Sequence, residues 1–197
     1  MGNAWNWNKG LPRKLGMSVI AVLVGIAIAY QIGSGVVIDE LTGKPMSGVF
    51  VVARWSARAI NPVHSNDVCF KVVSTKTDAV GQFKLWPISW NFNPLHWFRK
   101  RELYFYVHGD VAGEQNMMFP LLVSMRRDDP EAAQRIRSIR ELAKRMGCGP
   151  EMQQREFLLP VYRGMAEEAR EIADRTGKPG FANSIQWYVD NLTYTRR

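Results

Sequence analysis

Residues whose types could carry out chemistry are few in this 197-residue chain, and they lie far apart. The three histidines are His64, His96 and His108. None has a second His or a Glu at the spacing that places two metal ligands on one helix face. Gly-x-Ser-x-Gly and glycine-rich phosphate-binding motifs are also missing. The sequence therefore predicts no metal site, no cofactor and no catalytic residue, although a Ser-His-Asp group assembled by the fold stays open.

The two cysteines, Cys69 and Cys148, stand 79 residues apart. In an oxidising compartment an isolated pair of this kind is usually joined, whereas a redox-active pair stands much closer in sequence. We expect a disulfide between them, with two buried thiols as the alternative. In the chain-entropy model, closing so long a loop stabilises the fold by about 4 kcal/mol.

The segment 86–101 is the main candidate for a binding loop. It contains five aromatic residues and two prolines, and it ends in three consecutive basic residues. The candidate site residues are Trp90, Phe92, His96, Trp97, Arg99, Lys100 and Arg101. The rings could stack on a sugar or a peptide, or face a membrane with the basic end on lipid phosphates. The alternative is a loop folded over the domain, whose rings complete its core.

The N-terminal segment has the pattern of an export signal or a membrane anchor. Residues 1–16 contain basic residues and no acid, and residues 17–30 are apolar and uncharged. This asymmetry keeps the N-terminus inside and sends the following chain across the membrane. A signal peptide would be cleaved near Ala29. An anchor from Leu15 to Ile32, at 1.5 Å per residue, would span roughly 27 Å, enough for the hydrocarbon core.

Either interpretation places residues from about 34 onward outside the cytoplasm. We expect a bacterial inner-membrane protein with its C-terminal part in the periplasm, or, after cleavage, a soluble periplasmic or secreted protein. A third interpretation, in which the apolar segment is a buried core helix, leaves its flanking charges unexplained.

The formal net charge is +8, and 46% of the residues are hydrophobic, so a substantial core is available. The basic excess fits a solvated surface, or attraction to anionic lipid headgroups or an acidic envelope polymer. No nucleic-acid-binding motif is present, so nucleic acid is not an expected partner.

Short strands separated by turn signals occupy the middle of the chain. Asp39 and Asp78 each have a glycine a few residues later, in Gly43 and Gly81, which is typical of tight turns. Alternation predicts that Val49, Val51, Ala53 and Trp55 share one strand face, and that Phe83 and Leu85 share another. Further strands are expected at 68–74, 103–108 and within 113–125.

These motifs resemble the carboxypeptidase regulatory-like domain family over about residues 34–125. The motifs are Gly35-x-Val37-x-Asp39, Thr42-Gly43-x-Pro45-x-x-Gly48-Val49-x-Val51 and Thr77-Asp78-x-x-Gly81-x-Phe83-x-Leu85. The resemblance implies a transthyretin-like (prealbumin-like) β-sandwich. It also implies a module that accompanies a zinc peptidase without being the catalyst. The aromatic segment and the C-terminal third depart from the family pattern.

The C-terminal third predicts helices. Asp129-Pro130-Glu131 is a favourable helix start, and Ile136, Ile139, Leu142, Ala143 and Met146 follow at helical spacing before Gly147. A second helix is expected over about 151–174, with a break near Pro160, and a third over 181–194. We expect these helices to pack on a sheet face or edge, or else to present a surface to a partner.

The sequence thus predicts a mainly β protein. Its expected divisions are a basic lead-in and hydrophobic signal or transmembrane helix (1–33), a transthyretin-like antiparallel β-sandwich (34–125) and an α-helical C-terminal extension (126–197). The expected function is a non-catalytic binding or structural module of the cell envelope. Its partners would be the membrane, through the N-terminal helix, and an envelope protein or polymer. The alternatives are an accessory subunit of a membrane complex and an envelope hydrolase. A cleft where a histidine meets a carboxylate would favour the hydrolase.

Overall fold

A computed structural model describes residues 25, 33–59, 67–85, 96–109, 114–115, 122–125, 131–148 and 154–194. The strands are β1 (Ser34–Asp39), β2 (Phe50–Ala59), β3 (Asp67–Lys76), β4 (Gln82–Lys84), β5 (His96–Tyr106), β6 (Glu114–Gln115) and β7 (Leu122–Met125). They are followed by α2 (Ala132–Met146), the π-helical turn η1 (Gln154–Leu158), α4 (Leu159–Thr176) and α5 (Gly180–Tyr194).

The strands form two sheets, with orders β4-β1-β7 and β3-β2-β5-β6. In the first sheet β1 is antiparallel to β4 and parallel to β7, and in the second sheet β2 is antiparallel to both β3 and β5. One apolar cluster contains side chains of both sheets, among them Val37 of β1, Val51 of β2 and Phe105 of β5. The two sheets therefore share a core, as β-sandwich layers do.

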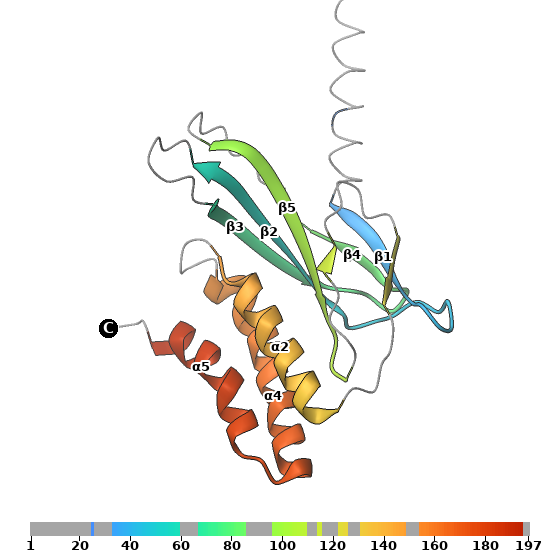
Figure 1. Cartoon of the computed structure of the whole chain (residues 1–197). Coiled ribbons are helices and arrows are strands. Elements are labelled where there is room, and N and C mark those ends of the chain that lie inside the picture. Colours follow the sequence, from blue (N-terminus) through green and yellow to red (C-terminus); the bar gives the residue numbers. More distant parts are fainter. Residues whose placement is uncertain are drawn as a thin grey trace, which may run out of the picture.

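The other face of the larger sheet is covered by helices (Figure 1). A second apolar cluster joins Val52 of β2, Val72 of β3 and Tyr104 of β5 to buried side chains of α2, α4 and α5. Because successive residues of a strand point to opposite faces, Val51 enters one core and Val52 the other. The domain therefore has three layers: a small sheet, a larger sheet and helices.

The expected mainly β fold is wrong. The helices form a full layer that supplies most of one of the two cores, so they are not an appendage to a β-sandwich. The expected membrane helix, Leu15 to Ile32, lies outside the described residues except for Gly25. In the part of the chain that the structure describes, no helix is long and apolar enough to cross a bilayer.

The turn chemistry expected from the sequence is confirmed. Asp39 Oδ1 accepts hydrogen bonds from the amides of Leu41 and Thr42, at 2.9 and 3.1 Å. Asp78 Oδ1 accepts from the amides of Val80 and Gln82, at 3.0 and 2.8 Å. These short-range bonds hold the two turns without help from distant residues.

Helix positions are also close to those expected. The apolar residues predicted for the first helix are all buried in α2, which ends just before Gly147. Glu131 is its N-cap residue, and the Glu131 side chain makes no capping hydrogen bond. Pro160 stands in the first turn of α4, directly after η1, so the expected break near this proline is a change from π-helix to α-helix.

Gly81 and Gly43 allow a matched test of backbone strain. A Cβ on Gly81 would lie 2.6 Å from Val37 O at a φ of +74°, whereas Gly43, at +66°, has no heavy atom within 4 Å of that position. We expect Gly81→Ala to lower the free energy of unfolding by about 3 kcal/mol or more and Gly43→Ala by about 1 kcal/mol. Urea denaturation of both variants measures the difference, and equal losses would contradict the predicted clash.

Candidate functional site

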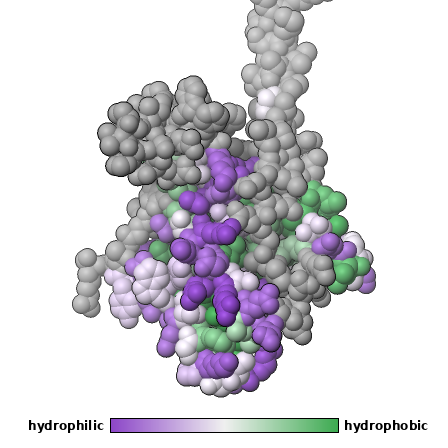
Figure 2. Space-filling view, in the orientation of Figure 1, coloured by the Kyte–Doolittle hydropathy of each residue, from purple (hydrophilic) through white to green (hydrophobic). Residues whose placement is uncertain are grey.

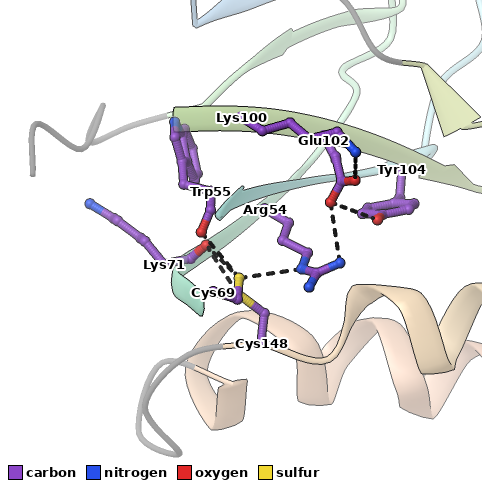
Figure 3. Close-up of polar contacts among 8 residues, drawn as sticks. All are labelled: Arg54, Trp55, Cys69, Lys71, Lys100, Glu102, Tyr104 and Cys148. Atoms are coloured by element: carbon purple, nitrogen blue, oxygen red, sulfur yellow. Dashed lines mark hydrogen bonds and ion pairs between the residues drawn. A yellow bond between two sulfur atoms is a disulfide. The ribbon is translucent and has the colours of Figure 1, made fainter. Parts of the chain in front are cut away.

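The predicted disulfide is confirmed. Cys69 of β3 is bonded to Cys148, two residues beyond the end of α2, with the Cα atoms 5.3 Å apart. The bond links the larger sheet to the first helix of the helical layer (Figure 3). It therefore fixes the C-terminal end of α2 against the sheet.

A charged network lies beside the disulfide on the helix-facing side of the sheet (Figure 3). The carboxylate of Glu102 in β5 lies 3.2 Å from Arg54 Nη1 and 2.5 Å from Lys100 Nζ, and it accepts a hydrogen bond of 3.2 Å from Tyr104 Oη. Arg54 Nε donates to Cys69 Sγ at 3.3 Å. The network thus connects β2, β3 and β5 through polar side chains.

The electrostatic balance at Glu102 favours the charged carboxylate. Glu102 is buried, and burial by itself would raise its pKa. The hydrogen bond from Lys100 and the positive charges of Arg54 and Lys100 outweigh burial, so the pKa of Glu102 lies below its ordinary value. Because these cations neutralise its charge, the buried carboxylate of Glu102 can hold neighbouring strands together.

The expected aromatic binding loop is in part a strand. His96, Trp97, Arg99, Lys100 and Arg101 belong to β5, where they pair with β2 over Ala59 to Trp55. Lys100 forms an ion pair with Glu102, and burial lowers the pKa of Arg101. Trp90 and Phe92 lie outside the described residues. The structure therefore places the basic end of the segment, residues 96–101, in the larger sheet.

A pocket of about 210 Å³ lies at the opposite end of the helical layer from the disulfide. It is formed by the end of β5, the first turn of α2 and the C-terminal half of α4. Its lining residues are His108, Gly109, Ala132, Arg135, Glu168, Glu171, Ile172 and Arg175.

The buried carboxylate of this pocket, Glu168, accepts four hydrogen bonds. Oε1 accepts from Arg135 Nε at 2.6 Å and from the Gly109 amide at 3.2 Å. Oε2 accepts from Arg135 Nη2 at 2.9 Å and from Tyr106 Oη at 2.9 Å. Burial, and next the charge of Glu168, raise the pKa of Tyr106 far above its ordinary value, so its hydroxyl stays a donor. Glu168 is therefore a structural hub between β5, α2 and α4.

Arg135 donates hydrogen bonds through two of its three guanidinium nitrogens. Nε and Nη2 face Glu168, and Nη2 also donates to the Val107 carbonyl at 3.0 Å. Its side chain is only 5% exposed. The remaining nitrogen, Nη1, is buried without a hydrogen-bond partner among the described residues. A buried donor of this kind is rare in folded proteins and usually has a water or ligand beside it.

His108 and Glu171 meet at the mouth of the same pocket. His108 Nε2 lies 2.9 Å from Glu171 Oε2, and their side chains are 50% and 67% exposed. This is the histidine–carboxylate contact that would favour a hydrolase. However, the other carboxylate of the pocket, Glu168, already accepts four hydrogen bonds, so it has no lone pair placed to activate water. Of the other histidines, His64 lies outside the described residues, and His96 begins β5.

No metal site is formed within the described ranges, where no group of three or more His, Cys, Asp or Glu side chains could hold an ion. Two of the buried carboxylates, Glu102 and Glu168, are neutralised by adjacent cations. The Glu102 network joins strands of the larger sheet, and the Arg135–Glu168 pair joins two helices.

Sequence reasoning missed the Arg135–Glu168 pair, although a signal for it exists. Arg135 precedes Ile139 and Leu142 by four and seven residues, so it lies on the apolar face of α2. Glu168 lies between Met165 and Ile172 on the buried face of α4 in the same way. A charged residue on the apolar face of an amphipathic helix predicts a buried partner of opposite charge.

Neither a scan against protein-family models nor a search of curated proteins finds a match for this chain. The resemblance to the carboxypeptidase regulatory-like family stays a prediction.

The disulfide is expected to contribute about 4 kcal/mol to stability, because it closes a 79-residue separation. Replacing both Cys69 and Cys148 by serine should lower the free energy of unfolding in urea by about that amount. A reducing agent should destabilise the wild type equally and leave the double variant unchanged. A wild type insensitive to reduction would contradict the predicted contribution.

The two carboxylates of the pocket should respond very differently to neutralisation. Glu168→Gln leaves the buried guanidinium of Arg135 without its counter-charge, which should cost about 3 kcal/mol of folding free energy. Glu171→Gln removes an exposed contact and should change stability by no more than about 0.5 kcal/mol. Thermal and urea unfolding compare the two, and similar losses would show that the buried pair is not the structural hub.

Proposed function

We propose that this chain is a non-catalytic binding module of the bacterial cell envelope, placed outside the cytoplasm, which binds an acidic polymer. The disulfide supports an oxidising compartment, because such bonds are rare in proteins that stay in the cytosol. The two facing sheets and their Asx-type turns support the resemblance to the carboxypeptidase regulatory-like family. In the namesakes of that family, the domain accompanies a zinc peptidase without being the catalyst.

The observation that carries the proposal is the exposed side of α2. We call Arg137, Arg140 and Lys144 the basic face; all three are exposed and lie at helical spacing. Figure 2 shows hydrophilic side chains along this side of the molecule, over α2, which is labelled in Figure 1. Glu141 is the one acid on the exposed side of this helix. A row of cations spaced over about two helical turns, roughly 10 Å, suits a partner with repeated negative charges.

The basic face has a rigid support. The opposite face of α2 is buried in the helix-side core through Ile136, Ile139 and Met146. One end of the helix is fixed by the Arg135–Glu168 pair and the other by the disulfide. Little ordering of the protein is then needed on binding, which favours affinity for a given number of charge contacts.

A hydrolase is the second candidate function, favoured by the contact between His108 and Glu171. The exposed position of both groups and the saturation of Glu168 support binding over catalysis. Replacing His108 by Gln tests the alternative directly. Loss of a hydrolytic activity towards envelope peptides or glycans, with unchanged stability, would establish the hydrolase and overturn the non-catalytic proposal.

Charge reversal on the basic face should weaken polymer binding. We expect Arg137→Glu with Arg140→Glu to lower the affinity for polyglutamate or alginate at least about tenfold and to flatten its salt dependence. The matched control is Lys44→Glu with Lys178→Glu, which changes the net charge equally at exposed positions outside α2. Surface-immobilised polymer, titrated at several salt concentrations, gives both quantities.

Three outcomes would count against the proposal. Equal losses in the two double variants would mean that only net charge matters. Unchanged binding in the α2 variant would mean that the binding surface lies elsewhere on the protein. If the wild type bound anionic lipid vesicles more strongly than either polymer, the partner would be a membrane surface and not a polymer.

A further inference from the structure

We propose that the acidic polymer is a polysaccharide whose sugar rings stack on Trp187 of α5 while its carboxylates meet the basic face of α2. Polysaccharide binding rests on the proposed function and deepens it, since it names the chemical class of the polymer. It also adds a second contact surface, on the side of α5 that adjoins α2.

Trp187 is a large aromatic side chain that the fold leaves in solvent. It is 61% exposed, although Ile185 and Leu192 of the same helix are buried in the helix-side core. Covering an exposed indole with a flat apolar partner is favourable, because the ring carries a large apolar area. The C–H face of a pyranose ring is such a partner, and its hydroxyls can stay in water during stacking.

Two further rings support the indole of Trp187. The ring centroids of Trp187 and Tyr188 are 5.0 Å apart, in an edge-to-face arrangement with an angle of 83° between the planes. Tyr188 in turn lies 5.3 Å from Tyr162, a buried residue whose hydroxyl donates to the Ala143 carbonyl of α2 at 3.1 Å. The exposed ring is thus packed on a series of rings that begins in the core. Less side-chain entropy is then lost when a sugar stacks on it.

The indole and the basic face belong to one surface of the helical layer. Figure 1 shows α5 beside α2, and both helices contribute side chains to the helix-side core. Burial, and next the charge of Glu141, raise the pKa of Tyr188, whereas the charge of Arg140 lowers it. Tyr188 is therefore close to two exposed residues of α2, one of which is part of the basic face. Because Trp187 packs against Tyr188, one polymer chain can contact the ring and the basic face together.

The chemistry of this surface favours a sugar acid over an acidic polypeptide. Arg140 and Lys144 complement the carboxylates of either kind of polymer. Glu141 is exposed beside Arg140, where it repels any carboxylate but can accept hydrogen bonds from sugar hydroxyls, which polyglutamate does not offer. A uronate polymer presents a carboxylate, hydroxyls and an apolar ring face in each repeat. The surface has a group suited to each of these three features.

The test compares alginate with polyglutamate of equal chain length, since each carries one carboxylate per repeat. We expect the full-length wild type to bind alginate about fivefold more tightly, a factor that corresponds to about 1 kcal/mol of stacking. Dextran, a neutral polysaccharide, should bind more weakly than alginate because it offers no charge to the basic face. Surface-immobilised polymers, titrated at one ionic strength, give the three affinities.

Variants of Trp187 separate stacking from charge. Trp187→Ala should remove the preference for alginate and leave binding of polyglutamate unchanged, whereas Trp187→Phe keeps a ring and should keep most of the preference. The matched control is Leu41→Ala, which removes an exposed apolar side chain from the turn after β1, in the small-sheet layer. It should change neither affinity. Urea unfolding should show that all three variants are folded, because the replaced side chains are exposed.

Several results would overturn the assignment of a polysaccharide. They are equal binding of alginate and polyglutamate, tighter binding of dextran than of alginate, and an effect of Trp187→Ala that is absent or equal for the two acidic polymers. If both acidic polymers bind equally and both need Arg137 and Arg140, the proposed function stands and only the polysaccharide fails. If neither polymer needs these arginines, the proposed function fails and stacking on Trp187 beside a basic face fails with it.

Discussion

The whole domain depends on one strand being buried from both sides. In β2 the consecutive residues Val51, Val52 and Ala53 are all fully buried, which is possible only if each face of the larger sheet is covered. The small sheet covers one face and the helices cover the other. Neither layer is optional, because removing either would expose a continuous apolar sheet face.

This constraint explains where the polar interactions lie. The middle of the sheet–helix interface is apolar, through Val52, Val72 and Tyr104 among others, and its charges stand towards its ends. Near one end are Cys69–Cys148 and the Glu102 network, and at the other is Arg135–Glu168. Burying an ion pair costs desolvation that its attraction only partly returns. Such a pair adds little net stability, but its geometry specifies how α2 and α4 meet β5.

Interactions between residues close in sequence could be predicted, and those between distant ones mostly could not. The turns at Asp39 and Asp78 depend on bonds across two to four residues, so their residue types were enough to predict them. The apolar face of α2 followed from spacing alone. The disulfide was predictable because only two cysteines exist to be paired. By contrast, Arg135 and Glu168 are 33 residues apart on separate helices, and their types do not say which partner each finds.

The same limit explains the two corrections. The number of helices was visible in the sequence, but not that they form a full layer of the core, because amphipathicity shows which face is buried and not what covers it. The segment 96–101 was assigned to a loop because prolines and aromatic residues precede it. Pairing with β2, a non-local interaction, makes it a strand and turns Lys100 towards Glu102.

The charged residues of α2 finally fall into a buried set and an exposed set. Four arginines stand on this helix, and their angular positions decide what each can do. Arg135 lies on the buried side, where a guanidinium must find acceptors, and all but one of its nitrogens do. Arg137 and Arg140 lie on the solvent side, where water already satisfies them and their charge can act on a partner. Basic residues of one short segment therefore lie in different environments, which only the three-dimensional structure distinguishes.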